Sequence, residues 1–483
     1  MSNKNVNSAV ISSLFWKLME RGGTQGIQFI VQIILARLLL PKDYGMVAIV
    51  MIFISLANVF VQKGFNTALI QKKEVDEIDL STVFYINIIV AILIYIVLFF
   101  SAPIIAEYYN MPKLSNVLRV LSFTLFIGAF DSVQNAIISR EMAFRKLFYS
   151  SLGAILISGF VGILTAYLGL GVWALVFQQL IFQLMVAIIL WMNVKWIPKL
   201  LFSGDKAKTL FSFGGKILLT SLLDTLYTDL RTLIIGKIYT PSILGYYNRG
   251  KQFPALIITN VNGAIQSVML PALSAQQDDK IRVKNMMRRS IISSSFVVFP
   301  LLIGLLVTAD KIVVILLTEK WLPAVPFIQI YCLSYALFPI HTSNLQAINA
   351  LGRSDIFLKL EIIKKLIGVL ILIVSIQYGI YAIAIGELLG GFIATFVNAY
   401  PNKKLLDYSY KDQVKDIIPS FFLAIIMGFF VYLVNYLELQ YFTTLVLQIV
   451  FGIIIYVGIA KLLKMESYVY IESTLRNITK RNN

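Results

Sequence analysis

The stretch ILARLLLPKDYG at residues 34–45 returns as IIGKIYTPSILG at residues 234–245. A cation, a proline and a glycine hold the same places in both: Arg37, Pro41 and Gly45 in the first, and Lys237, Pro241 and Gly245 in the second. The copies are 200 residues apart, and each joins one long apolar segment to the next. The repeat predicts two homologous lobes, and polar residues in the segment before each motif predict a shared, polar-lined cavity.

The composition is that of an integral membrane protein. Hydrophobic residues make up 58% of the chain and charged residues 14%, and the mean hydropathy is +0.80. Soluble domains contain about 25% charged and about 45–50% apolar residues. Cys332 is the single cysteine, which excludes an intramolecular disulfide and a cysteine-based metal cluster. We expect neither a cofactor nor a bound metal.

About fourteen apolar segments are long enough to cross a bilayer, which takes about 20 residues in a helix. They lie at about 10–39, 44–70, 80–106, 115–138, 147–168, 172–194, 209–239, 243–273, 290–309, 324–350, 356–377, 381–400, 416–437 and 441–463. A further segment at 311–323 is too short to span and is expected at the membrane interface. The sequence thus predicts an all-α integral membrane fold.

The loop cations predict the orientation of the chain. Lysines and arginines gather in every second loop and in the C-terminal tail. Cytoplasmic loops carry such an excess, so we expect a multi-pass membrane protein with both termini in the cytoplasm. The net charge of +17 then mostly reflects topology. Its scatter over many short loops argues against nucleic-acid binding.

The repeat also predicts the domain organisation. Six segments separate the start of one copy from the start of the next, so both lobes enter the membrane in the same orientation, as parallel repeats do. We expect an N-lobe at 1–204 with helices 1–6 and a C-lobe at 205–404 with helices 7–12. Residues 405–483 hold an appended pair, helices 13 and 14, and a cytoplasmic tail.

Polar side chains on three of these segments are the candidate site. An ionisable side chain inside a bilayer costs about 2.5–3.5 kcal/mol, so it normally faces a cavity or a partner. The candidates recur at spacings of three and four residues, which is one face of a helix. The cationic candidates for substrate binding are Lys17, Arg21, Lys216, Arg231, Arg249 and Lys251. The candidates for a polar cavity wall or ion coupling are Gln28, Gln32, Asp224, Asp229 and Asn260.

Cations outnumber carboxylates in this set, which favours an anionic substrate, because guanidinium and ammonium groups match phosphate oxygens. The accompanying amides and hydroxyls can bond sugar hydroxyls. A diphosphate between a lipid and an oligosaccharide meets both conditions, while nucleotide sugars and organic anions stay open. Structural roles stay open too: Lys17 and Arg21 could snorkel to the cytoplasmic interface, and Asp229 could pair with Arg249.

Two further polar residues of the apolar segments have structural interpretations. Glu387 lies beside a GxxxG pattern that starts at Gly386, and such patterns indicate close helix packing. His341, the single histidine, is expected to be a packed intramembrane side chain rather than a ligand or proton relay.

Several stretches together resemble one transporter family. They are LARLLLPKDYGMVA (35–48), ISREMAFRKL (138–147), LGYYNRGKQFPAL (244–256), TEKWLPAVPFIQIYCL (318–333) and LQAINALGRSD (345–355). In this order they resemble the Wzx-like polysaccharide flippases of the multidrug/oligosaccharidyl-lipid/polysaccharide exporter superfamily. The resemblance runs through nearly the whole chain. It implies a V-shaped pair of six-helix lobes around a central cavity that opens alternately to each face.

The same resemblance implies a function. The substrate would be an undecaprenyl-diphosphate-linked oligosaccharide repeat unit. It would be moved to the outer leaflet of the bacterial cytoplasmic (inner) membrane for O-antigen, capsule, teichuronic acid or exopolysaccharide synthesis. The family's cationic cavity residues would fall on Lys17, Arg21, Lys216, Arg231 and Arg249. We expect a monomer in contact with membrane lipids, with polymerase and glycosyltransferases of the same pathway as possible partners.

Three alternatives remain. The first two, a lipid II flippase and an ion-coupled drug or metabolite exporter, belong to the same superfamily, although exporters of cationic drugs would need more acidic cavity residues. The third is a membrane polysaccharide polymerase or ligase. Such an enzyme needs a substantial outer loop, but the longest outer connection is expected at about 310–323, and no nucleophile–base constellation is evident. We therefore expect a transporter and not an enzyme.

Overall fold

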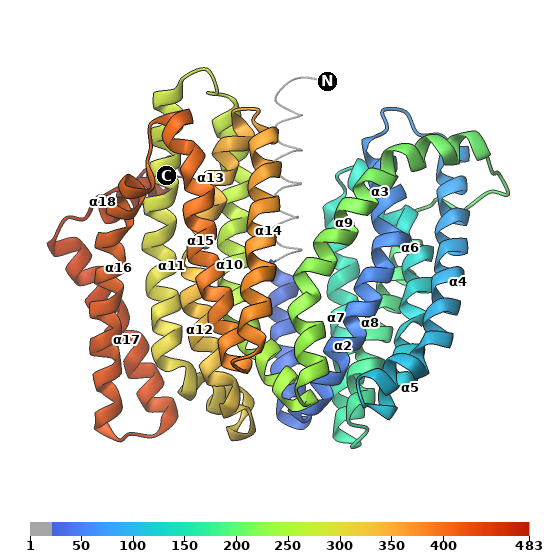
Figure 1. The fold of residues 1–483 in the computed structure, drawn as a ribbon, viewed down its shortest axis with the longest axis horizontal. Helices are drawn as coiled ribbons and strands as arrows, with labels where there is room; N and C mark the ends of the chain where they lie inside the picture. Colours follow the sequence, from blue (N-terminus) through green and yellow to red (C-terminus); the bar gives the residue numbers. More distant parts are fainter. Residues whose placement is uncertain (1–21, 483) are drawn as a thin grey trace. The chain divides into compact units, whose positions relative to one another are not determined.

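The structure is a computed structural model that describes residues 22–482 (Figure 1). Over this range the chain is helical, and no β-strand occurs among the described residues. The helices form two compact units, of which the first ends at Gly245 and the second begins at Tyr246. The all-α prediction is confirmed.

The first unit begins with a helix over 22–38. It continues with α2 (Pro41–Asn58), the π-helix η1 (Val59–Lys63), α3 (Gly64–Gln71), α4 (Glu77–Tyr108), α5 (Pro112–Leu121), α6 (Phe123–Arg140), α7 (Phe144–Tyr167), α8 (Val172–Asn193) and α9 (Gly204–Ile238). Two of these runs are interrupted rather than straight: α2, η1 and α3 follow one another without a gap, and α5 and α6 are separated by Ser122 alone.

The second unit takes most of α10 (Pro241–Ser274). It continues with α11 (Lys280–Leu317), η2 (Glu319–Ala324), α12 (Val325–Ala336), α13 (Phe338–Ala350), α14 (Ser354–Ile376), α15 (Ile380–Leu406), α16 (Tyr410–Leu433), η3 (Val434–Leu437), α17 (Tyr441–Leu462) and α18 (Glu466–Asn482). The segment 311–323, expected at the interface, does not form a separate element. Its first part continues α11 to Leu317, and its remainder forms most of the 3-10 turn η2.

Eleven helices of the described chain are long and apolar enough to cross a membrane. The helix at 22–38, α9 and α14 are not among them. Of these, α9 and α14 carry several charged side chains along their length. The structure thus agrees with a multi-span membrane protein.

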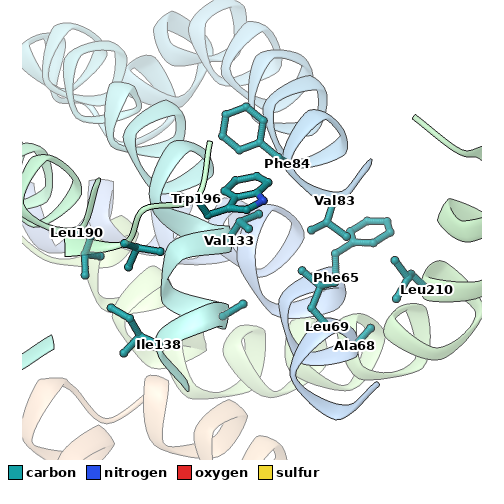
Figure 2. Packing of buried hydrophobic residues seen from close by; sticks show 12 residues of the cluster. Phe65, Ala68, Leu69, Val83, Phe84, Val133, Ile138, Leu190, Trp196 and Leu210 are labelled. Atoms are coloured by element: carbon teal, nitrogen blue, oxygen red, sulfur yellow. The ribbon is translucent and has the colours of Figure 1, made fainter. Parts of the chain in front are cut away.

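Buried aromatic and aliphatic side chains of the first unit pack together in one cluster (Figure 2). Phe84 of α4 stands edge-on to Trp196, with ring centroids 5.9 Å apart. Trp196 lies in the link from α8 to α9, and its indole nitrogen donates to a carboxylate oxygen of Glu77 over 3.3 Å. Leu210 of α9 is buried in the same cluster. The link and the start of α9 are therefore anchored to α3, α4 and α6.

The two sequence motifs meet in space within the first unit. Pro41 and Pro241 are the first residues of α2 and α10, a position that suits the fixed φ of proline. Gly45 lies against the Pro241 carbonyl, and Gly245 lies against the Pro41 carbonyl. Lys237 donates to the carbonyl oxygen of Tyr108. It therefore satisfies the C-terminus of α4, not that of its own helix.

Candidate functional site

Two of the cationic candidates, Lys17 and Arg21, lie outside the residues that the structure describes. The other candidates fall on separate helices of the two units. In the first unit, α9 carries Lys216, Asp224, Asp229 and Arg231. In the second, α10 carries Arg249, Lys251 and Asn260.

A polar stripe runs along α9. It consists of Lys208, Ser212, Lys216, Thr220, Asp224 and Thr228, which are four residues apart and all exposed in the described chain. We call this set the α9 stripe. At 3.6 residues per turn, successive members are offset by about 40°, so the stripe winds slowly around the helix. It places lysine and hydroxyl groups along one path on the surface of the unit.

The N-terminal part of the α9 stripe lines a shallow hollow of about 470 Å³, whose walls are Lys208, Thr209, Ser212 and Lys216. The hydroxyls of Thr209 and Thr220 donate to the carbonyls four residues earlier, as does that of Thr228. Their oxygen lone pairs remain able to accept. The hollow therefore presents ammonium donors beside hydroxyl acceptors, which suits an anionic group linked to a polar, hydroxyl-bearing one.

The other side of α9 is packed against the rest of the first unit. The Ser55 hydroxyl of α2 donates to a carboxylate oxygen of Asp229 over 3.1 Å, and Arg231 is half-buried. Asp229 thus takes part in a helix–helix contact. On the first helix, Gln28 is exposed, whereas the Gln32 amide donates to Gln178 over a long 3.4 Å.

Lys251 belongs to a hydrogen-bonded cluster of the second unit. Its ammonium nitrogen lies 3.4 Å from a carboxylate oxygen of Glu387. The other oxygen of Glu387 accepts from the Tyr331 hydroxyl over 2.7 Å. Tyr247 lies 2.5 Å from the Tyr331 hydroxyl and 3.4 Å from Glu387. We call these four residues the Glu387 cluster, which joins α10, α12 and α15.

The geometry of the Glu387 cluster indicates how firmly each partner is held. Tyr331 is fully buried, whereas the Lys251 side chain is 33% exposed. A charge-assisted N–H···O bond is usually about 2.7–2.9 Å long, so the 3.4 Å contact of Lys251 is loose and that of Tyr331 is tight. Lys251 therefore lies at the accessible edge of the cluster with a carboxylate already beside it.

Arg249 is almost fully buried in this structure. Its side chain is 5% exposed, its guanidinium donates to the Gln252 amide oxygen over 2.6 Å, and it lies 5.4 Å from the centre of the Trp321 ring. Next to it, a Cβ on Gly250 would lie 2.4 Å from the Cβ of Phe327. Arg249 thus packs α10 onto η2 and α12 in this structure. Farther along α10, Asn260 is exposed and donates to the Leu256 carbonyl.

Sequence reasoning missed Glu387 as a partner of Lys251. The close helix packing predicted at Gly386 is supported, because a Cβ on this residue would lie 3.0 Å from Ile371 and 3.2 Å from the Ser375 hydroxyl of α14. The signal was present: Glu387 is an acid in an otherwise apolar helix, and such residues normally have an intramembrane partner. What the sequence lacked was the packing of α15 on α12 that brings this partner close.

His341 behaves as a packed side chain. Its two ring nitrogens lie 3.0 Å from the Thr395 hydroxyl and 3.0 Å from the Asn398 amide. Across residues 22–482, no three His, Cys, Asp or Glu side chains gather as metal ligands would.

Comparison with protein families gives one match over most of the chain. A family described as polysaccharide biosynthesis protein matches residues 34–326. The match includes both copies of the repeated motif and the whole α9 stripe.

Individual relatives agree with this match. The lipopolysaccharide biosynthesis protein WzxC of Escherichia coli K12 is 23% identical over 431 residues, which cover 87% of this chain and 86% of WzxC. The teichuronic acid biosynthesis protein TuaB of Bacillus subtilis 168 is 26% identical over 303 residues, 62% of each chain. Among solved structures, the lipid II flippase MurJ in an inward closed conformation superposes with a TM-score of 0.76 at 16% identity. That match covers 93% of this chain and 98% of MurJ, so it shows a common fold.

Proposed function

The chain belongs to the polysaccharide biosynthesis protein family, and from that membership we propose that it is a flippase for lipid-linked oligosaccharides. Its substrate would be an undecaprenyl-diphosphate-linked repeat unit, moved across the bacterial cytoplasmic membrane by alternating access. The glycan made from it would be O-antigen, capsule, teichuronic acid or exopolysaccharide. The names of WzxC and TuaB, which refer to cell-surface glycans, support this substrate class.

The observation that carries the proposal is the α9 stripe. Exposed ammonium groups on a helix of a membrane protein are costly unless they line a polar path or meet an anion. Lys208 and Lys216 are matched to a diphosphate by charge, and the hydroxyls between them and beyond them to sugars. Lys17, Arg21, Arg231 and Lys251 are proposed to extend this cationic surface, with Gln28, Gln32, Asp224, Asp229 and Asn260 as polar or ion-coupling groups.

We further propose fourteen spans in two parallel six-helix lobes. The eleven apolar spans, together with the helix at 22–38, α9 and α14, add up to fourteen. In this scheme the N-lobe is 1–204 and the C-lobe is 205–404, arranged as a V around a central cavity, and α16 and α17 are the appended pair. Both termini are proposed to lie in the cytoplasm.

A lipid II flippase is the second candidate, because the fold is that of MurJ. The family match and the names of the sequence relatives favour glycan repeat units. An ion-coupled exporter of cationic drugs is less well supported by the lysines of the α9 stripe.

The proposal is tested by deleting the gene in a host without a redundant flippase. Undecaprenyl-linked repeat units should then accumulate on the cytoplasmic leaflet, measured by their protection from an externally added glycosidase, and export of the polymer should stop. Normal polymer export would contradict the proposal. Accumulation of lipid II instead would assign the second function.

A further inference from the structure

The C-terminal helix of the second unit, α18, forms one wall of a polar pocket that we call a cup. The cup has a volume of about 400 Å³ and lies between α11 and α18. Its polar walls are Arg289 and Ser293 of α11, Lys464 of the turn after α17, and Ser467, Tyr470 and Ser473 of α18. We call this the α18 cup. It combines two cations with four hydroxyls, and it plays no part in the site described above.

Next to the cup, Arg288, Glu466, Asp416 and Tyr408 form a hydrogen-bonded group that we call the clasp. The Arg288 guanidinium donates to both carboxylate oxygens of Glu466 over 2.7 and 2.8 Å. The Nε of Arg288 lies 3.0 Å from each oxygen of Asp416. The Tyr408 hydroxyl donates to Asp416 over 2.6 Å. Glu466 also lines the cup, but both of its oxygens are taken by Arg288. The clasp therefore fixes α18 on α11 and α16 while the side chains of Arg289 and Lys464 still line the cup.

An apolar groove lies farther along α11 from the cup. On α11, Arg289 and Ser293 are followed at the same four-residue spacing by Val297 and Leu301, which line a groove of about 540 Å³ between α11, α16 and α17. Across it stand Ile453 and Val457 of α17. Along α11 the lining residues thus change from a cation and a hydroxyl to aliphatic side chains, in the order in which a phospholipid changes from head group to acyl chain.

The position of the cup on the chain agrees with a membrane–water boundary. It begins two residues after the last residue of α17, where Leu462 and Leu463 are 82% and 69% exposed. Exposed leucines at the end of a membrane span normally contact lipid. Basic pockets at such boundaries bind anionic lipid head groups.

We propose that the α18 cup binds the phosphate of an anionic phospholipid, with an acyl chain of that lipid in the groove below. The guanidinium of Arg289, 5.6 Å from the centre of the Tyr470 ring, and the ammonium of Lys464 bind the phosphate oxygens. The serine hydroxyls bind the glycerol or the remaining oxygens. In the orientation proposed above, this lipid belongs to the cytoplasmic leaflet.

The test uses the purified full-length protein in a neutral detergent, with lipid binding measured by native mass spectrometry. Phosphatidylglycerol should bind more tightly than phosphatidylcholine of the same chain length. The double variant Arg289→Gln/Lys464→Gln should weaken phosphatidylglycerol binding by about 30-fold, at roughly a few-fold per cation. The matched variant Lys461→Gln/Lys415→Gln removes two cations outside the cup and should bind like the unchanged protein.

A second variant covers the possibility that loss of both cations disturbs folding. Ser473→Trp keeps every charge but fills the cup, and it should weaken phosphatidylglycerol binding to a similar extent while the unfolding temperature in phosphatidylcholine stays the same. Equal binding by the cup variants and the control variants would overturn the proposal. So would full competition by millimolar inorganic phosphate, which marks a free-anion site, or preferential binding of undecaprenyl phosphate, which marks a substrate site.

Discussion

Gly45 and Gly245 face each other across the crossing of α2 and α10, each lying on the carbonyl group of the other helix's proline. A Cβ on Gly45 would lie 1.8 Å from the Pro241 oxygen, and a Cβ on Gly245 would lie 2.1 Å from the Pro41 oxygen. The contact is reciprocal, so the sequence repeat is also a repeat in space. Both prolines and both glycines belong to the first unit, so the contact is made within it.

Alanine at Gly45 or Gly245 should therefore separate the two helices. The added methyl group would overlap a backbone carbonyl, which cannot rotate away, and we expect a loss of about 1–3 kcal/mol in stability together with loss of polymer export. Thermal unfolding and complementation of a deletion strain measure these effects. Gly458→Ala of α17, where no atom lies within 4 Å of the new methyl group, should be neutral or slightly stabilising. Wild-type behaviour of both crossing variants would contradict the close contact.

Removal of the lysines of the α9 stripe should impair transport without unfolding the protein. Lys208→Gln/Lys216→Gln keeps polar side chains but removes the charges proposed to meet the diphosphate, and we expect at least a tenfold fall in complementation or in flipped repeat units. Lys216→Arg should keep part of the activity, because it retains the charge. Lys73→Gln, an exposed lysine outside the stripe, is the control. Full export by the double variant would refute the role of the stripe.

In the Glu387 cluster, substitutions of Lys251 and Glu387 should have coupled effects on stability. Lys251→Met removes the ammonium group beside the Glu387 carboxylate, and Glu387→Gln removes the negative charge beside Lys251. Each single change should lower stability by about 1–3 kcal/mol, because a polar group loses its partner. The double variant Lys251→Met/Glu387→Gln should lose less than the sum of the two, as measured by thermal unfolding. Strict additivity would show that the 3.4 Å contact contributes nothing.

Arg140, the last residue of α6, is expected to stabilise the packing of α6 against the end of α3. Its guanidinium donates to the carbonyls of Leu69 and Lys72 over 2.6 Å each, and to those of Ile70 and Lys73 over 3.2 Å. These carbonyls lie at and just beyond the C-terminus of α3 and have no partner within the helix. Arg140→Gln should cost about 1–3 kcal/mol, measured by chemical unfolding, and Arg140→Lys should recover part of it. Arg145→Gln, on the next helix, is the control.

Because the clasp depends on the Glu466 carboxylate, we expect α18 to detach from α11 and α16 in acid. The hydrogen bonds from Arg288 hold the pKa of Glu466 below its ordinary value of 4.5. A lowered carboxyl pKa gives stability that is complete above the unfolded-state pKa and is lost as the pH falls through the folded-state pKa. Amide exchange in α18 should therefore accelerate as the pH falls below about 4.5, relative to exchange in α17. Glu466→Gln should accelerate exchange already at pH 7 and remove this pH dependence, whereas Glu472→Gln should leave it in place.

The sequence alone determined the class of the protein and much of its layout. Composition and apolar segment length required a helical membrane protein, since a backbone inside a bilayer must satisfy its own hydrogen bonds. The repeat at Pro41 and Pro241 located equivalent helix starts, and the four-residue spacing of Lys216, Thr220 and Asp224 predicted one polar path on α9. These features depend on residues close together in the chain, so periodicity is enough to find them.

Only the tertiary structure decided which faces meet. Arg249 and Lys251 are two residues apart, yet one is buried beside Trp321 and the other lies at the edge of the Glu387 cluster. Helical periodicity gives the angle of a side chain on its own helix, but the partner depends on which distant helix packs there. Gly45 and Gly245 show the same limit: the repeat predicted that they are equivalent, and only the packing of α2 on α10 revealed that they touch.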